Sequence, residues 1–390
     1  MFLRVPIQPI EGLDRLDRSF GMLSSFPPTA CGLATFTAAL AAGLAAHDTH
    51  VGVVRVVDAG GPPSRSDLVV GELVNGSSSS MVAGSDLLDQ CDVAVVQHEY
   101  GLYGGADGDE VLEILGGLHV PSIVIAHTVL TNPTRHQRSV LNEVAALAGR
   151  VVVMTDAARV RLCQGFDVDP SKVTTIAHGA AVPTGRVVPD RSGPPLILTW
   201  GLIGPGKGIE RVIDAMPTLH DLPGEPRYLV AGQTHPKVLA AHGESYRRGL
   251  RAHAERLGIS ASVVFDADYR DVSSLTALIQ SSTVVVLPYD SKDQVTSGVL
   301  VDAVAAGRPV VATAFPHAVE LLSSGAGIVV DHDDPDAMAR ALRRVLTRPE
   351  LAAKMAAEAS RLAPSLGWSV VAGEYLRVAE CLLAERLALV

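Results

Sequence analysis

The chain alternates short, continuous runs of apolar residues with longer stretches in which apolar and polar residues mix. Continuous apolar runs are typical of strands that a parallel sheet buries on both faces, and the mixed stretches are typical of covering helices. Strands are predicted at 21–25, 50–57, 92–97, 121–126, 150–154, 172–176, 196–200, 228–231, 263–265, 283–287, 309–313 and 328–330. Helices are predicted at 33–46, 109–118, 134–148, 156–163, 297–306, 335–346 and 349–362, with a last one after Trp368. Loops rich in Gly, Pro and Ser are predicted at 60–67 and 75–80.

The length and the breaks in this pattern predict two domains. A chain of 390 residues is longer than one hydrophobic core usually serves. We expect an irregular extension at 1–18, a first domain at 19–185, a second at 186–365 and a final helix at 366–390 that crosses back to the first domain. Strands that alternate with helices imply the α/β class, here two doubly wound, Rossmann-like domains with a cleft between them.

Composition narrows the class of protein. The chain is 47% hydrophobic with a net charge of −10 and has no basic run, which argues against nucleic-acid binding. It has no apolar run of the ~20 residues that span a bilayer, although an amphipathic face still allows peripheral membrane contact. Its four cysteines show no metal-ligand or redox spacing, which favours a reduced, cytoplasmic protein.

The strand at 196–200 leads directly into a glycine-rich loop that ends at Lys207 and precedes a helix. Glycines allow backbone N–H groups to turn toward an anion, and the helix N-terminus and the lysine add positive charge. Gly201, Gly206 and Lys207 fit seven positions of a P-loop, but Gly208 stands where Ser or Thr would hold Mg²⁺. The loop therefore predicts a phosphate site without that metal ligand; the alternative is a tight turn with a surface lysine.

Other polar residues follow the predicted strands, where ligands sit in open parallel sheets. His127 ends the strand at 121–126, and we expect it to act in the cleft. His98, Glu99 and Tyr100 follow the strand at 92–97 and suit either acceptor contact or loop packing. Gly232 and Gln233 end the strand at 228–231 and lie within reach of the same cleft.

With this layout, the chain resembles the retaining GT-B glycosyltransferases of family 4 (glycosyl transferases group 1) over roughly residues 19–385. Three stretches carry the resemblance, and their order along the chain makes it specific. They are the strand and loop through Lys207-Gly208-Ile209, the stretch 284–313 with Glu320-Leu321 beyond it, and the N-terminal set of Gly32, His127 and His178-Gly179.

The resemblance implies a reaction. Such enzymes move a hexose from a nucleotide-diphosphate sugar, here GDP-mannose or a UDP-hexose, to an acceptor hydroxyl on a sugar, a lipid-linked molecule or a small molecule. They retain the anomeric configuration by a front-face mechanism and need neither metal nor cofactor. The second domain then holds the donor, and the first domain shapes the acceptor site.

The resemblance also assigns roles to residues. It implies catalytic roles for His127, Lys207 and Gln294, and acceptor-side positions for His98, Glu99 and Tyr100. The donor and its diphosphate are expected at Gly32, Gly201, Gly206, Lys207, Gly232, Gln233, Ser297, Gly298 and Asp302. No metal ligand is expected.

Three positions depart from the family pattern. Leu202 replaces an arginine, and Gln294 and Asp302 replace the paired glutamates E-x7-E. The chain instead resembles a subgroup with G-L-I-x-P-x-K-G, Q-H-E-[FY]-G and T-S-G signatures. The alternatives are a catalytically weak nucleotide-sugar-binding protein, a nucleotide-sugar epimerase of the same fold, and a P-loop ATPase, against which Gly208 argues.

Overall fold

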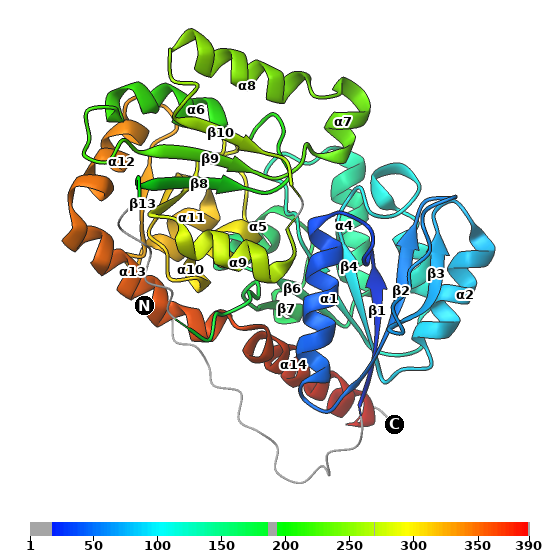
Figure 1. The fold of residues 1–390 in the computed structure, drawn as a ribbon. Helices are drawn as coiled ribbons and strands as arrows, with labels where there is room; N and C mark the ends of the chain where they lie inside the picture. Colours follow the sequence, from blue (N-terminus) through cyan, green and yellow to red (C-terminus); the bar gives the residue numbers. More distant parts are fainter. Residues whose placement is uncertain (1–17, 186–192, 269, 389–390) are drawn as a thin grey trace.

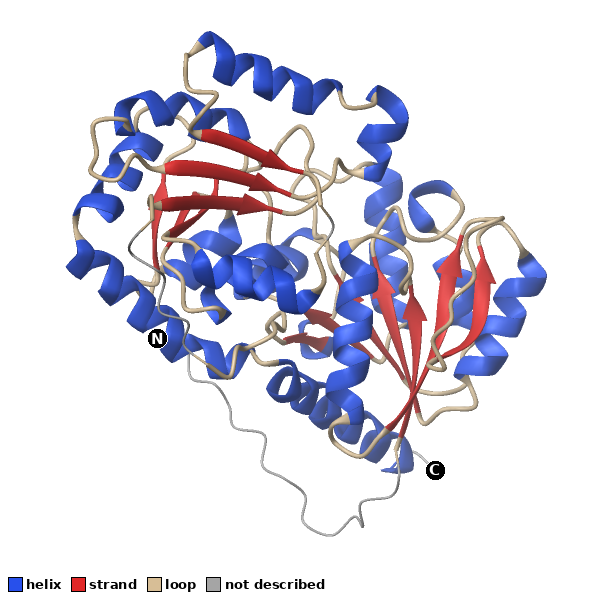
Figure 2. Ribbon diagram, in the orientation of Figure 1, coloured by secondary structure: helices blue, strands red, loops and turns tan. Residues whose placement is uncertain are grey.

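Two parallel sheets form the framework of the protein. The computed structural model describes residues 18–185, 193–268 and 270–388, and Figure 1 shows the two sheets lying beside each other. The first has seven strands in the order β3-β2-β1-β4-β5-β6-β7, and the second has six in the order β10-β9-β8-β11-β12-β13. Helices cover both faces of each sheet (Figure 2), which explains why the strands read as continuous apolar runs. The predicted fold class is confirmed.

The first half alternates strands and helices up to the segment before the second sheet. Its strands are β1 (Ser19–Ser24), β2 (His50–Val57), β3 (Val69–Val74), β4 (Val93–His98), β5 (Ser122–Ala126), β6 (Arg150–Val153) and β7 (Val173–Thr175). Its helices are α1 (Gly32–Ala45), α2 (Ser78–Leu88), α3 (Val111–Gly117), α4 (Arg135–Leu147) and α5 (Asp156–Gly165), with 3₁₀ turns η1 (Ala106–Gly108) and η2 (Pro170–Lys172).

The second half repeats this alternation and ends in three consecutive helices. Its strands are β8 (Leu196–Trp200), β9 (Arg227–Ala231), β10 (Val263–Asp266), β11 (Val284–Leu287), β12 (Val310–Thr313) and β13 (Gly327–Val330). Its helices are α6 (Ile209–Ala215), α7 (Pro236–His242), α8 (Ser245–Arg256), α9 (Val272–Ser281), α10 (Gly298–Ala305), α11 (Pro316–Leu322), α12 (Ala337–Thr347), α13 (Pro349–Leu366) and α14 (Trp368–Ala388), with a 3₁₀ turn η3 (Met216–Leu219).

Each sheet reverses its strand order at one point, and that point organises the loops of interest. The reversal lies between β1 and β4 in the first sheet and between β8 and β11 in the second. Ligands of doubly wound sheets bind in the crevice at the carboxyl ends of the strands beside such a reversal. The loops that begin at Gly201 and Pro288 follow β8 and β11, and those that lead to Gly32 and Glu99 follow β1 and β4. The topology therefore selects these four loops before any side chain is considered.

The last helix, α14, packs on the first domain and lies against α1 (Figure 1). Buried residues of α14, among them Tyr375 and Ala379, join the apolar cluster that contains Phe36 and Leu40 of α1. At the point of closest approach, a Cβ on Gly43 would lie 2.8 Å from the carbonyl oxygen of Trp368. The two helices therefore need glycine at position 43.

The sequence misjudged several elements. The loop predicted at 75–80 is wrong at its end, because α2 begins at Ser78 and the side chain of Ser77 caps it by accepting the N–H of Ser80. Strand β3 and helices α2, α7, α8, α9 and α11 were not predicted. Helix α2 was missed because its sequence is rich in serine, and α8 because its sequence is rich in arginine. Serine is nevertheless a preferred N-cap, and arginine is a good helix former.

Parts of the predicted domain layout fall outside the described residues. The extension at 1–18 is described only at residue 18, and residues 186–192, the first of the predicted second domain, are not described. The domain boundary at 185 therefore stays a prediction. Among the described helices, none combines the length and the apolar character that crossing a membrane requires.

Candidate active site

The loop after β8 is shaped by glycines whose backbone no other residue can adopt without strain. Gly208 has a φ of 63°, and a Cβ there would lie 1.9 Å from the carbonyl oxygen of Pro288. Gly232 has a φ of 126°, and its Cβ would lie 2.1 Å from the carbonyl oxygen of Gly201. Position 208 therefore has no room for the Ser or Thr side chain that a P-loop uses to hold Mg²⁺.

Lys207 lies with its ammonium nitrogen 4.5 Å from the centre of the Tyr289 ring. Tyr289 is buried and stacks on Phe315, with 5.1 Å between ring centres. The negative face of an aromatic ring attracts a cation without consuming its hydrogen-bond donors as a carboxylate would. The backbone N–H of Asp290 donates to the carbonyl of Gly206 at 3.0 Å and ties this loop to the one after β11. Lys207 is therefore a positioned cation.

The N-terminus of α10 lies beside this loop, because a Cβ on Gly201 would lie 3.8 Å from Val299. Ser297 caps the helix: its hydroxyl accepts the N–H of Leu300 at 3.3 Å, and its own N–H donates to Nδ1 of His317 at 2.8 Å. Both polar groups of Ser297 are engaged and its side chain is buried. Ser297 therefore shapes the start of α10, and the contacts of Ser297 and Gly298 with the diphosphate stay predictions.

Gln294 and Asp302, which replace the two glutamates, have different surroundings. The amide of Gln294 donates to the carbonyl of Thr296 at 3.0 Å, so it is turned into its own loop. Asp302 lies on α10, and burial raises the pKa of its carboxyl to about 7. Asp302 therefore changes charge near neutral pH, whereas Gln294 carries no charge at all.

His127 at the end of β5 is held by a chain of hydrogen bonds that fixes its protonation. The amide nitrogen of Gln97 donates to Oγ1 of Thr37 at 2.9 Å, and that hydroxyl donates to the carbonyl of Leu33 at 2.8 Å. The side-chain oxygen of Gln97 therefore faces Nε2 of His127 and accepts a hydrogen bond from its N–H. A neutral His127 consequently presents Nδ1 as an acceptor.

Ring contacts connect His127 to the second domain. Phe36 of α1 packs edge-on against His127 and His178, at 4.9 Å and 5.0 Å between ring centres. Nδ1 of His178 donates to the carbonyl of Gly179 at 2.6 Å, and a Cβ on Gly298 would lie 2.9 Å from Nε2 of His178. The predicted halves of the site therefore meet: His127 is separated from the start of α10 by two aromatic side chains.

The three residues predicted on the acceptor side are one hydrogen-bonded carboxylate, Glu99, and two side chains that pack, His98 and Tyr100. Oε2 of Glu99 accepts the hydroxyl of Thr128 at 2.5 Å, and Oε1 accepts the N–H of Tyr100 at 3.1 Å. The hydroxyl of Tyr100 donates to the carbonyl of Gln137 at 3.3 Å. His98 is 1% exposed and packs edge-on against Tyr100. Burial favours the packing alternative for His98, and its contact with an acceptor stays a prediction.

Burial keeps the histidines of this region neutral at pH 7. It lowers the pKa of His127 to about 3, with smaller contributions from the nearby His178 and His98. It lowers the pKa of His98 and of His178 to about 4, and that of His317, which also lies near His178, to about 3. The site therefore draws its fixed positive charge from lysine and helix dipoles, and its histidines act only as neutral donors or acceptors.

Hydrogen bonds join the two domains beside the site. The hydroxyl of Thr155 donates to the carbonyl of Val295 at 2.9 Å, and Val295 is buried in the core of the first domain. The carboxylate of Glu320 accepts the first two N–H groups of α5, at 3.0 Å and 2.9 Å. Arg161 of α5 donates to the carbonyl of Asp293 at 2.8 Å. The loop that carries Gln294 is therefore anchored in the first domain.

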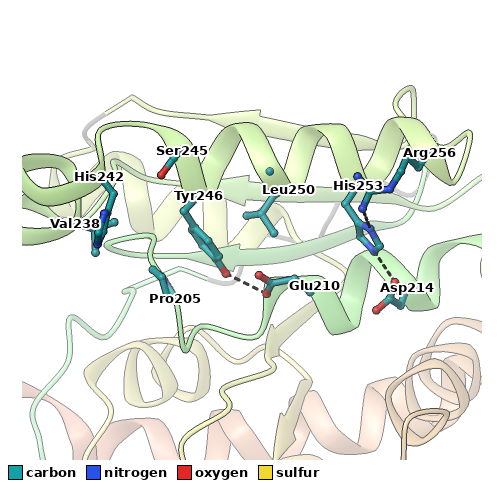
Figure 3. Close-up of a pocket in the computed structure, with 11 residues that line it drawn as sticks. Pro205, Glu210, Asp214, Val238, His242, Ser245, Tyr246, Leu250, His253 and Arg256 are labelled. Atoms are coloured by element: carbon teal, nitrogen blue, oxygen red, sulfur yellow. Dashed lines mark hydrogen bonds and ion pairs between the residues drawn. The ribbon is translucent and has the colours of Figure 1, made fainter.

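A cavity of about 500 Å³ lies between α6 and α8 (Figure 3). Its acidic side chains are already paired: Glu210 accepts the hydroxyl of Tyr246 at 3.0 Å, and Asp214 lies 2.6 Å from Nε2 of His253. Every lining residue belongs to the second domain, and none of the predicted site residues is among them. The cavity adjoins the glycine-rich loop, because Pro205 and Glu210 line it, but neither Lys207 nor His127 does.

The remaining predicted residues have simple places. Gly32 is exposed at the start of α1, with nothing within 4 Å of an added Cβ. Gln233 is exposed, and its carbonyl accepts the N–H of Ile203 at 2.8 Å. The sequence missed Gln97, Thr128 and Tyr289. Gln97, which follows four apolar residues in β4, carried a signal, and both Gln97 and Tyr289 lie in stretches that carry the family resemblance.

The sequence has relatives of known activity. Residues 186–362 match the family model described as Glycosyl transferases group 1. A D-inositol 3-phosphate glycosyltransferase of Frankia alni is 30% identical over 248 residues, which are 60% of this chain and 59% of that protein. The chain thus spans about three fifths of this relative's length.

The fold has close counterparts among solved structures. Anabaena Alr3699/HepE in complex with UDP superposes with a TM-score of 0.73 at 16% identity, over 93% of this chain and 100% of that one. Sucrose-phosphate synthase of Thermosynechococcus elongatus gives a TM-score of 0.71 at 17% identity, over 94% and 100%. At such identities the likeness establishes the fold alone. The chain therefore has the GT-B fold, and its residues 186–362 carry the match to glycosyl transferases group 1.

Proposed function

We propose that the protein is a glycosyltransferase that moves a hexose from a nucleotide-diphosphate sugar to an acceptor hydroxyl. One observation carries the proposal: the contacts join His127 of the first domain, through Phe36 and His178, to the start of α10 beside the Gly201–Lys207 loop. A diphosphate at this loop lies next to a cation and a helix N-terminus, and the sugar attached to it extends toward His127.

The reaction proceeds with retention at the anomeric carbon. The bond from that carbon to the phosphate oxygen breaks, and the bond to the acceptor oxygen forms on the same face. The acceptor proton passes to the leaving phosphate, so no protein base is required. Lys207 stabilises the charge that develops on the leaving diphosphate, and Nδ1 of His127 accepts a hydrogen bond from a sugar hydroxyl.

The donor and the partners are proposed by analogy. UDP is bound by the Anabaena protein of the same fold, and UDP-hexoses are therefore the first donors to test, with GDP-mannose beside them. The relatives act on D-inositol 3-phosphate, which makes a sugar, a polyol or a lipid-linked molecule the natural class of acceptor. We place the enzyme in the cytoplasm, with peripheral membrane contact left to experiment; its four described cysteines are free thiols.

Thermal unfolding with a panel of nucleotide sugars tests the donor, because a ligand that binds only the folded state raises the melting temperature. The matching donor should also release free nucleotide slowly without an acceptor, faster with one, and equally in EDTA. The magnetic resonance spectrum of the product should show the donor's anomeric configuration. Binding without any nucleotide release would favour a catalytically weak binding protein, and an altered sugar nucleotide would favour an epimerase.

A further inference from the structure

Glu99 places a carboxylate on the acceptor side of the site, at the edge where β4 and β5 end. The two strands are neighbours, and the N–H of His127 donates to the carbonyl of His98 at 3.1 Å. This pairing brings Glu99 beside Thr128, whose hydroxyl it accepts at 2.5 Å. Glu99 is a half-buried residue at this edge, and both of its carboxylate oxygens accept hydrogen bonds from the protein.

The contacts of Glu99 are those that an ionised carboxylate needs. Burial raises the pKa of the Glu99 carboxyl above its usual value, and hydrogen bonds from Thr128 and Tyr100, together with the charge of Lys237, offset only part of that rise. Both protein hydrogen bonds are donated toward its oxygens, and a carboxylate retains lone pairs for further hydroxyl donors. Thr128, in turn, directs its hydroxyl proton to Glu99 and does not offer it to an anion.

Little positive charge opposes Glu99. The neighbouring histidines, His98 and His127, are neutral at pH 7. Arg161 donates to the carbonyls of Val129 and Asp293 at the domain junction. Within the described part of the chain, the cation brought to Glu99 is Lys237 of α7, whose Nζ would lie 3.1 Å from a Cβ on Gly101. Lys237 belongs to the second domain and is exposed, so it offsets the carboxylate only in part.

We infer that Glu99 selects an uncharged polyhydroxy acceptor and rejects a phosphorylated one. The carboxylate accepts hydrogen bonds from the hydroxyls of a neutral sugar or polyol, and it repels a phosphate brought to the same place. This inference rests on the proposed function, and it separates the chain from relatives whose name specifies D-inositol 3-phosphate.

Paired ligands that differ only in the phosphate test this inference. The affinities of myo-inositol and D-myo-inositol 3-phosphate are measured by calorimetry on the full chain, with UDP present to occupy the proposed diphosphate site at the Gly201–Lys207 loop. Wild type should prefer myo-inositol. Glu99→Gln should raise the affinity for the phosphate on the order of tenfold or more without raising that for myo-inositol. Glu113→Gln, which removes an exposed carboxylate from α3, should behave as wild type.

The outcomes are decisive. An affinity of Glu99→Gln for the phosphate within about twofold of wild type, including no binding by either protein, overturns the inference. A wild type that prefers the phosphate does the same. If melting curves show that Glu99→Gln is not folded, Glu99→Ala replaces it under the same criteria. Failure of the proposed function is read separately, as absence of nucleotide release from every nucleotide sugar, and leaves the affinity ratio of the two inositols unaffected.

Discussion

The two sheets have the same kind of strand-order reversal, but the loops beside it differ in chemistry. In the second domain, the loops after β8 and β9 work through their backbone: a Cβ on Gly208 or Gly232 would lie 1.9 Å or 2.1 Å from a carbonyl oxygen, and one side chain, Lys207, adds charge. In the first domain, the loops after β4 and β5 work through side chains, because Gln97 orients His127 and Thr128 orients Glu99.

The difference follows from what each side has to bind. Every nucleotide-sugar donor carries the same diphosphate, and backbone N–H groups with one cation suit it whatever the sugar. Acceptors differ from one another, so their recognition needs side chains whose charge and hydrogen-bond direction can be changed one at a time. A site divided in this way can keep the same diphosphate-binding loop while substitutions in the first domain change which acceptor it binds.

Lys207→Ala should break the donor side and have the largest effect. Loss of the fixed cation removes stabilisation of the leaving diphosphate, and we expect kcat/KM to fall about 10²- to 10³-fold, with weaker nucleotide binding. Steady-state kinetics and calorimetry with UDP measure both. Lys292→Ala is the matched control, because Lys292 is an exposed lysine paired with Asp333 and should leave activity unchanged. Wild-type activity in Lys207→Ala would remove Lys207 from the mechanism.

His127→Ala should affect the first-domain side of the site and spare the diphosphate loop at Gly201–Lys207. The variant loses one hydrogen-bond acceptor near the reacting sugar, and we expect kcat to fall about ten- to a hundredfold while UDP affinity changes less than about threefold. Gln97→Leu should give a smaller loss of the same kind, because it releases Nε2 of His127 without removing the ring. His119→Ala, at an exposed histidine paired with Asp89, is the control. Equal loss of UDP affinity and kcat would make His127 a structural residue.

The same contrast explains what the sequence could reveal. The apolar runs predicted the strands closely. The loop from Gly201 to Lys207 could be predicted from the local sequence alone, because a backbone with positive φ requires glycine at that same position. The tautomer of His127 depends on Gln97, Thr37 and Leu33, which come from separate parts of the chain and meet only in the folded sheet. The burial of His98 has the same origin: its strand-end position suited either acceptor contact or loop packing, and only the packed structure shows that the side chain is buried.

The buried histidines should also make the protein sensitive to acid. A histidine whose pKa falls on folding contributes stability above its unfolded pKa, and that stability is lost as the pH drops from about 6.5 toward the folded value. In the folded protein the pKa of His98 is about 4 and that of His127 about 3. Below pH 6.5 the unfolded chain therefore binds protons at these histidines that the folded protein does not bind. His178 and His317 add the same effect. Asp302 opposes them, because its raised pKa of about 7 favours the folded state as the pH falls.

Urea denaturation between about pH 7 and about pH 5 should therefore show a falling free energy of unfolding. His98→Asn should flatten this dependence by up to about 1.4 kcal/mol per pH unit, because His98 is 1% exposed and its removal deletes one proton from the balance. His119→Asn removes a histidine whose side chain is 86% exposed and should leave the slope unchanged. Equal slopes for wild type and His98→Asn would mean that His98 titrates alike in the folded and unfolded states. Water would then reach His98 more readily than its packing indicates, and the contrast between the two domains would be weaker.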